Sequence, residues 1–204
     1  MSSSNSIKPP SKPGAWKVHS EEIVFETPYI RARQQRCETM RGAIVDPYHV
    51  FDLPNWAAML AITPDHHAVL VRNYRHGSQR VMLELPGGII DDDDPNTEHA
   101  VARELREETG YSADRIFALP PIHPYPGRFR QMAYPYLGIG AVKAHEQALE
   151  DDEDLEVITM PLGDAFRVFA DGSVDIAIAH AGIMLAARHL ITSNPDLSEL
   201  RAHI

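Results

Sequence analysis

Short apolar runs separated by turn-forming residues fill much of the first half of the chain. The clearest are Trp56–Ile62, Ala68–Tyr74 and Val81–Leu85, where valine, leucine and alanine are frequent. Pro64-Asp65 and His76-Gly77-Ser78 lie between them, and these residue types favour turns. Runs of this kind are typical of β-strands. We expect further strands at Glu22–Thr27, Ile30–Cys37, Tyr48–Leu53, Ala113–Leu119, Gln131–Val142 and Leu155–Met160.

The strand pattern ends at Pro86-Gly87-Gly88 and gives way to a helical one. A helix is predicted over Thr97–Thr109, because Asn96 or Thr97 can cap its start and Gly110 stands where a glycine commonly ends a helix. Strands on both sides of this helix, followed by more helix, predict an α+β domain with α/β/α layers. The later helices are expected at Leu162–Ala170 and Val174–Ser193.

Three carboxylates gather on one side of the central predicted helix. Glu104, Glu107 and Glu108 are spaced i, i+3 and i+4, which places them in one stripe along the helix. Like charges at this spacing repel one another and destabilise a helix, unless a cation neutralises them. Hard cations such as Mg²⁺ prefer carboxylate oxygens and leave positions open for substrate phosphates. The stripe therefore predicts a helix-borne Mg²⁺ site for phosphate chemistry, although such stripes are commonly solvated helix faces.

The glycine turn and this helix together resemble the Nudix box. The family pattern is Gly, five residues, Glu, seven residues, then Arg-Glu-apolar-x-Glu-Glu-x-Gly-apolar. Its first half is altered here, since Asp94 follows Gly88 in place of the glutamate and eight residues separate it from the arginine. The segment 91–94 is then either a solvated acidic loop or part of the box. The second half matches in full at Arg103, Glu104, Leu105, Glu107, Glu108, Gly110 and Tyr111.

The flanking residues resemble the ADP-ribose pyrophosphatase branch of the Nudix family, the nucleoside diphosphate sugar hydrolases. The resemblance rests on Val71–Gly77 and on Leu83–Gly88, an arginine-containing strand and a Glu-x-Pro-x-Gly approach to the box. It implies an α/β/α sandwich around a mixed sheet, here spanning 51–204. It also implies a β-rich N-terminal extension, 15–50, that takes part in a homodimer. Residues 1–14 are rich in serine, proline and lysine and are expected to form a disordered tail.

The resemblance also implies a set of metal ligands. Glu104 and Glu108 would hold Mg²⁺ directly, with Mn²⁺ as an alternative metal. Glu107 would supply a further ligand or a water contact. Gly87 would add its backbone carbonyl, because glycine allows close approach of the chain.

Catalytic and substrate-binding roles follow from the same comparison. Glu153, in the acidic run 150–156, is the expected base for the attacking water, with Asp151 and Asp152 as weaker candidates. Arg103 is placed i,i+4 from Glu107 and is expected to orient it. Substrate-binding roles are expected for Arg75, which suits phosphate oxygens or a structural ion pair, for Glu84 of the Glu-x-Pro-x-Gly motif, and for Arg128 after Pro126-Gly127.

Composition narrows the classes of partner. The formal net charge of −10 argues against nucleic acid and against an anionic membrane surface. Cys37 is the only cysteine, so no intrachain disulfide forms, in keeping with the reducing cytoplasm. No apolar run is long enough for a membrane span, and the polar start lacks the apolar region of a secretory signal. Cys37 itself is expected to be buried.

The expected activity is Mg²⁺-dependent hydrolysis of ADP-ribose or a related nucleoside diphosphate sugar to a nucleoside monophosphate and a sugar phosphate. Dinucleotides and GDP-sugars are alternatives within this class. A non-catalytic domain that senses nucleotide sugars is the alternative from another class. Trp16, Tyr29 and Trp56 are candidates for stacking on the base, although tryptophan is more commonly a core residue.

Overall fold

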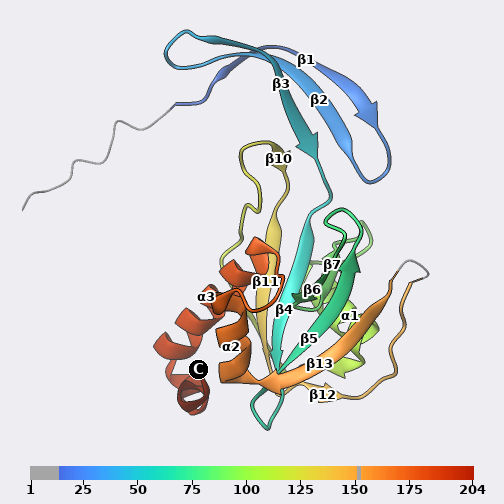
Figure 1. Cartoon of the computed structure of the whole chain (residues 1–204), viewed down its shortest axis with the longest axis vertical. Helices are drawn as coiled ribbons and strands as arrows, with labels where there is room; N and C mark the ends of the chain where they lie inside the picture. The colour runs from blue at the N-terminus through green and yellow to red at the C-terminus, as the bar shows by residue number, and fades with distance from the viewer. Residues whose placement is uncertain (1–13, 151–152) are drawn as a thin grey trace, which may run out of the picture. The chain divides into compact units, whose positions relative to one another are not determined.

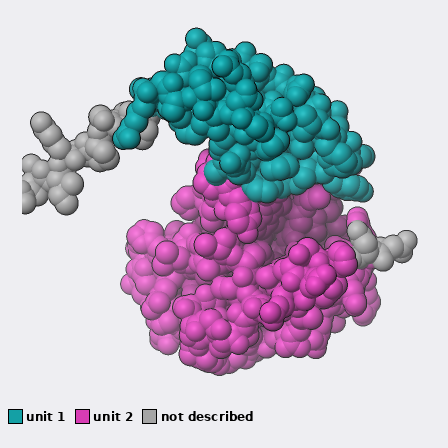
Figure 2. All heavy atoms as spheres, turned by 45° about the horizontal axis from the view of Figure 1, so that its top comes forward, with its two compact units in different colours: residues 1–53, 127–130 teal, residues 54–126, 131–204 magenta. Residues whose placement is uncertain are grey.

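The computed structural model describes residues 14–150 and 153–204, drawn in colour in Figure 1. The described chain forms two compact units, shown in teal and magenta in Figure 2. The first comprises 14–53 and 127–130, and the second comprises the rest. Almost all of the expected tail, together with Asp151 and Asp152, lies outside the described residues. In the described ranges, no helix is long and apolar enough to cross a membrane.

The first unit is a four-stranded sheet in the order β1-β2-β3-β10. Neighbouring strands are antiparallel except β10, which runs parallel to β3. Cys37 is buried in this sheet, as expected, whereas β1 is exposed along its whole length. The strands are β1 Lys17–Glu26, β2 Arg31–Glu38, β3 Ile44–Asp52 and β10 Phe129–Arg130.

The second unit is built on a seven-stranded sheet in the order β13-β5-β4-β11-β9, with β6 beside β5 and β7 beside β4. β4 and β11 are parallel, and the other pairs are antiparallel, so the expected mixed sheet is confirmed. Its strands are β4 Trp56–Ile62, β5 His67–Arg75, β6 Arg80–Glu84, β7 Gly87–Ile89, β9 Arg115–Ala118, β11 Ala133–Ile139 and β13 Leu155–Pro161.

Helices cover both faces of this sheet. The sheet is therefore buried on both sides, and side chains of β4 alternate between two apolar clusters. Ala57, Met59 and Ala61 join Val101 and Leu105 of α1, Thr97–Thr109. The opposite residues of β4 pack with α2, Leu162–Asp171, and α3, Ile178–Ser193 (Figure 1). The α+β class and the α/β/α layers are confirmed.

Most sequence-based elements agree with the structure, but several of their ends differ. β1 begins at Lys17 and β3 at Ile44, before the expected Glu22 and Tyr48. Gly87–Ile89 forms the short strand β7 on β4, although the glycines were expected to end the strand pattern. The last long helix begins at Ile178 rather than Val174, because Asp175 binds β6 through its carbonyl oxygen. Gly140, with φ +72°, divides the expected strand 131–142 into β11 and β12. Three short elements complete the unit: β12 Val142–Lys143 pairs with β8 Tyr111–Ser112, and the 3₁₀ helix η1 spans Pro195–His203.

Candidate active site

Two consecutive glycines bring the chain close to α1. Gly87 has φ +155°, and a side chain there would collide with the Ala57 carbonyl oxygen of β4. A Cβ on Gly88 would lie 2.6 Å from Oε1 of Glu104. The Gly87 N–H donates to the Glu108 carboxylate at 2.7 Å. The turn therefore fixes the Glu108 carboxylate by a hydrogen bond and leaves space for the Glu104 carboxylate beside Gly88.

The ends of α1 are defined by its capping residues. Asn96 accepts a hydrogen bond from the His99 N–H at 2.8 Å, and Gly110 ends the helix in the left-handed conformation with φ +74°. Within this frame Glu104 and Glu108 lie one turn apart on the buried side. Only 8% of Glu104 and 4% of Glu108 is exposed, and glutamate is seldom buried to this extent.

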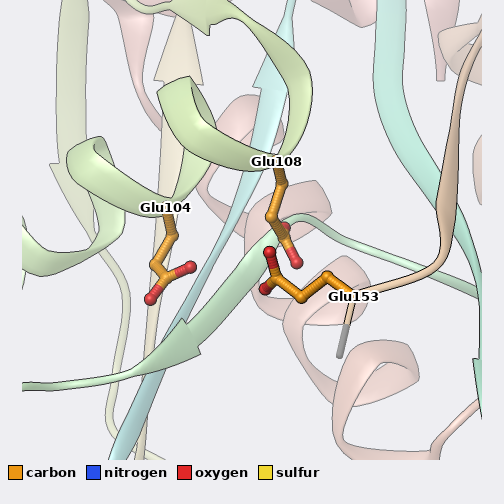
Figure 3. A group of neighbouring side chains, drawn as sticks. All are labelled: Glu104, Glu108 and Glu153. Carbon is orange, nitrogen blue, oxygen red and sulfur yellow. The ribbon is translucent and has the colours of Figure 1, made fainter. Parts of the chain in front are cut away.

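Glu153 joins these two glutamates from another segment. One carboxylate oxygen from each of Glu104, Glu108 and Glu153 lies within 4.8 Å of the others. Figure 3 shows the carboxylates of Glu108 and Glu153 facing each other, with Glu104 beside them. Glu153 precedes β13, and its side chain also accepts the Glu150 N–H at 2.8 Å.

Burial disfavours the ionised forms of Glu104 and Glu108 when no cation is bound. It raises the pKa of Glu108 to about 8 and that of Glu104 to about 7, against an ordinary value of 4.5. The Gly87 N–H opposes the shift at Glu108, and Arg103 opposes it at Glu104, while the charge of Glu153 raises both pKa values. Clustered, buried hard-oxygen donors of this kind fit a divalent cation such as Mg²⁺, whose charge would favour the ionised carboxylates.

Arg103 stands at the centre of a second charged group. One guanidinium nitrogen, Nη1, contacts Glu104 at 2.9 Å and Glu107 at 3.1 Å, as the i,i+4 spacing suggested. Nη2 contacts Asp94 and Asp91, each at 3.0 Å. Arg103 therefore links the acidic loop to the helix carboxylates.

Asp94 is not a solvated loop residue. Its side chain is only 3% exposed and also contacts His99 at 2.9 Å. The Arg103 hydrogen bond holds the pKa of Asp94 well below its ordinary value. Asp92 and Asp93, by contrast, are exposed. The altered first half of the box thus supplies a buried anchor for Arg103.

Arg75 and Glu84 form an ion pair beneath the turn. Nη2 of Arg75 lies 2.6 Å from Oε2 of Glu84, and Nε donates to both carboxylate oxygens at 2.9 and 3.1 Å. The Glu84 side chain is 3% exposed, whereas that of Arg75 is 49% exposed. The pair raises the pKa of Arg75. Arg75 therefore forms the structural ion pair that was one of its two expected roles. The exposed part of its side chain remains accessible to an anion.

The remaining expected residues lie in different surroundings. Glu107 is not a member of the three-carboxylate cluster, and Arg103 and Arg106 bind its carboxylate. Arg128 belongs to the first unit, where its guanidinium lies 4.0 Å from the centre of the Tyr48 ring and donates to the His49 carbonyl oxygen at 3.2 Å.

The aromatic candidates are divided between the two units. Trp16 packs edge-on against Tyr48 in the first unit, and Tyr29 is 72% exposed. Trp56 is partly buried and stacks on His180 in the second unit. In the sequence, His180 shows no metal-ligand spacing to other residues, so the sequence assigns it no functional role. The structure places it directly behind the glycine turn.

Comparison with known proteins agrees with this geometry. The model of the NUDIX domain matches residues 53–177. The chain belongs to the Nudix family. The model of the nucleoside diphosphate sugar hydrolase N-terminal domain matches residues 16–51. The expected family and branch are both confirmed.

Individual relatives point the same way. The chain is 28% identical to the ADP-ribose pyrophosphatase of Bacillus subtilis over 130 residues, 63% of this chain and 70% of that protein. It is 30% identical to the GDP-mannose pyrophosphatase of Yersinia pestis (strain Pestoides F) over 138 residues, 61% and 67% of the two chains. A crystal structure of an ADP compounds hydrolase has the same fold, with a TM-score of 0.73 at 18% identity over 89% of this chain and 97% of that one. The expectation of an enzyme that acts on phosphoanhydride bonds is confirmed.

Proposed function

We propose that this protein hydrolyses the pyrophosphate bond of ADP-ribose or a related nucleoside diphosphate sugar in a Mg²⁺-dependent reaction. The products would be a nucleoside monophosphate and a sugar phosphate. The observation that carries the proposal is the cluster formed by the buried Glu104 and Glu108 of the Nudix box with Glu153 from a separate segment. The relatives named ADP-ribose pyrophosphatase and GDP-mannose pyrophosphatase support the substrate class.

The metal would be held by residues that already lie together. Glu104 and Glu108 supply carboxylate oxygens from α1, and the Gly87 carbonyl is the proposed backbone ligand. A bound divalent cation neutralises phosphate oxygens and lowers the pKa of coordinated water. Mn²⁺ offers the same charge and ligand preference and serves as the alternative metal.

Proton transfer is assigned to Glu153. It is less buried than the other two carboxylates and comes from a separate segment before β13. A base must lie within hydrogen-bond reach of the attacking water, and Glu153 lies beside the two glutamates that would hold a metal-bound water. Arg103 is proposed to orient Glu104 and Glu107, since its guanidinium contacts both carboxylates.

Cationic side chains are proposed to bind the substrate. Glu84 holds the Arg75 guanidinium through paired hydrogen bonds, which leaves its exposed portion oriented for a phosphate oxygen. The substrate-binding role of Arg128, which lies on the Tyr48 ring in the first unit, stays a prediction from the family resemblance. These assignments favour a small anionic nucleotide over nucleic acid or a membrane as partner. The cytoplasm is the proposed location.

A panel of substrates tests this function. The protein is incubated with ADP-ribose, GDP-mannose and a diadenosine polyphosphate, each with Mg²⁺, with Mn²⁺ or with chelator. Chromatography then measures nucleoside monophosphate. Release of AMP or GMP that depends on the metal is the expected result. Saturable nucleotide-sugar binding without any product would contradict catalysis and favour the sensing domain.

A further inference from the structure

His180 lies at the start of α3 and binds the backbone just before the glycine turn. Its Nδ1 accepts the Leu85 N–H at 2.8 Å, although ninety-five positions separate the two residues. A backbone N–H can only donate, so Nδ1 must be unprotonated and the ring neutral, with its proton on Nε2. The imidazole is buried and stacks on Trp56, with ring centres 5.6 Å apart.

This contact is one of three that fix consecutive backbone groups of the turn. The Leu85 N–H is bound by α3, the Pro86 carbonyl accepts the Met59 N–H of β4 at 2.9 Å, and the Gly87 N–H is bound by Glu108 of α1. Proline has no N–H, so position 86 offers no further donor. The turn is thereby held by three different elements, and His180 supplies the only one of these contacts made by an imidazole.

The segment just before α3 also accepts a backbone hydrogen bond from β6. The Leu83 N–H donates to the Asp175 carbonyl at 2.9 Å, two positions before the Leu85 N–H reaches His180. The Asp175 carbonyl, a backbone group, satisfies the Leu83 N–H. At position 180 the chain is already helical, so the Leu85 N–H is satisfied by the His180 side chain and not by a backbone carbonyl.

We propose that His180 is a positioning residue for the metal site: by accepting the Leu85 N–H it holds the Leu85-Pro86-Gly87 turn where Gly87 meets Glu108 and faces the cation. This rests on the proposed function of that site. Burial supports the neutral ring, since it lowers the pKa of His180 to about 4, with Glu84 opposing that shift and Arg75 adding to it. Leu85 and Gly87 would move together if the acceptor were lost.

Three variants separate positioning from general packing. His180→Leu keeps an apolar side chain and removes the acceptor, whereas His180→Asn places a carbonyl oxygen near the position of Nδ1. Met184→Ala is the matched control, because Met184 is a buried core residue one turn further along α3. The dissociation constant for Mn²⁺ is measured by electron paramagnetic resonance of the free ion, alongside kcat and KM for ADP-ribose.

The proposal predicts that His180→Leu weakens Mn²⁺ binding by about tenfold or more and lowers kcat more than it changes KM. His180→Asn and Met184→Ala should bind Mn²⁺ within about threefold of the wild type, a margin below the tenfold effect of a lost supporting contact. Wild-type affinity in His180→Leu would overturn the proposal. Equal losses in His180→Asn and His180→Leu, or in Met184→Ala and His180→Leu, would do the same.

A measurement on the wild-type protein guards against a variant that does not fold. In ¹⁵N-labelled protein, a scalar coupling across the hydrogen bond between the Leu85 amide and Nδ1 is expected, and an imidazole with protonated Nδ1 would overturn the proposal. A wild type that binds Mn²⁺ yet hydrolyses no nucleotide sugar would contradict only the proposed function. In that case the Mn²⁺ comparison still decides the role of His180.

Discussion

At the residue scale, the Arg103 guanidinium organises the acidic groups around it. It contacts Asp91, Asp94, Glu104 and Glu107, and the side chain of Asp94 is the least exposed of the four. An uncharged side chain at position 94 would leave the guanidinium with weaker support on the loop side. The helix carboxylates that Arg103 orients would then be less well fixed.

Asp94→Asn is therefore expected to destabilise the fold by about 1–3 kcal/mol and to lower kcat/KM by roughly tenfold. Since its pKa is depressed in the folded state, Asp94 contributes stability above the ordinary aspartate pKa and loses it as the pH falls below that value. Urea unfolding at neutral pH and steady-state kinetics measure the two effects. The exposed Asp92→Asn is the control, and an Asp94→Asn protein indistinguishable from it would contradict the anchoring role.

His180 gives a second pH dependence, in which the folded protein favours the neutral form of the side chain. Its folded pKa of about 4 lies below its ordinary value of 6.5, so the unfolded chain binds more protons between these values. The stability from neutral His180 is complete above pH 6.5 and is lost as the pH falls toward 4, with an upper limit of about 3 kcal/mol. Urea unfolding at pH 7.5 and pH 5 should show a smaller decrease for His180→Asn than for the wild type. An equal decrease would contradict the neutral buried ring.

At the element scale, the glycine turn packs directly against α1. The Gly87 N–H binds Glu108, and Gly88 leaves no space for a side chain beside Glu104. A methyl group on Gly88 would press on the Glu104 carboxylate. Gly88→Ala should therefore weaken Mn²⁺ binding by about tenfold while the protein remains folded. Gly77→Ala is the control, since nothing lies within 4 Å of a Cβ at that position. Calorimetric titration with Mn²⁺ that gave equal affinities for the two variants would contradict the close approach.

Sequence periodicity predicted the elements whose causes are local. α1 was predicted over its full observed length because its caps, Asn96 and Gly110, are its immediate neighbours in the chain. β7 and the true start of α3 were not predicted, because they depend on hydrogen bonds to β4 and β6. Elements fixed by neighbouring residues were therefore predicted, and elements fixed by hydrogen bonds to distant residues were not.

The same distinction holds in the candidate site. Glu104 and Glu108 were singled out by spacing on one helix, and Glu153 by its place in an acidic run that resembles the family loop. The roles of Asp94 and His180 were not visible, because their partners are a guanidinium across a loop and a backbone amide far along the chain. Neither partner leaves a periodic signal in the sequence.

At the scale of the whole molecule, the N-terminal sheet bears on assembly. β1 is an edge strand, and Val18, Ile23 and Phe25 along it are about half exposed. Exposed strand edges with apolar side chains favour pairing with another chain. We propose that 15–50 contributes to a homodimer.

Light scattering at micromolar concentration should then give twice the chain mass of 22.8 kDa. Phe25→Glu should shift the protein toward the monomer, because a charge would replace an apolar contact. Leu185→Glu alters an exposed apolar residue of α3 and serves as the control. A wild-type protein that scatters only as a monomer would contradict the dimer.

The central claim is that Glu104 and Glu108 hold the cation for pyrophosphate hydrolysis. The most direct measurement is the Mg²⁺-dependent rate of AMP release from ADP-ribose by Glu108→Gln, with Glu98→Gln as an exposed control on the same helix. Glu108→Gln removes one ligand charge and should lower the rate by about 10²-fold or more in a folded protein, while Glu98→Gln should match the wild type. A Glu108→Gln enzyme that keeps more than about half of the wild-type rate would contradict the assignment, because losing a metal ligand should cost far more.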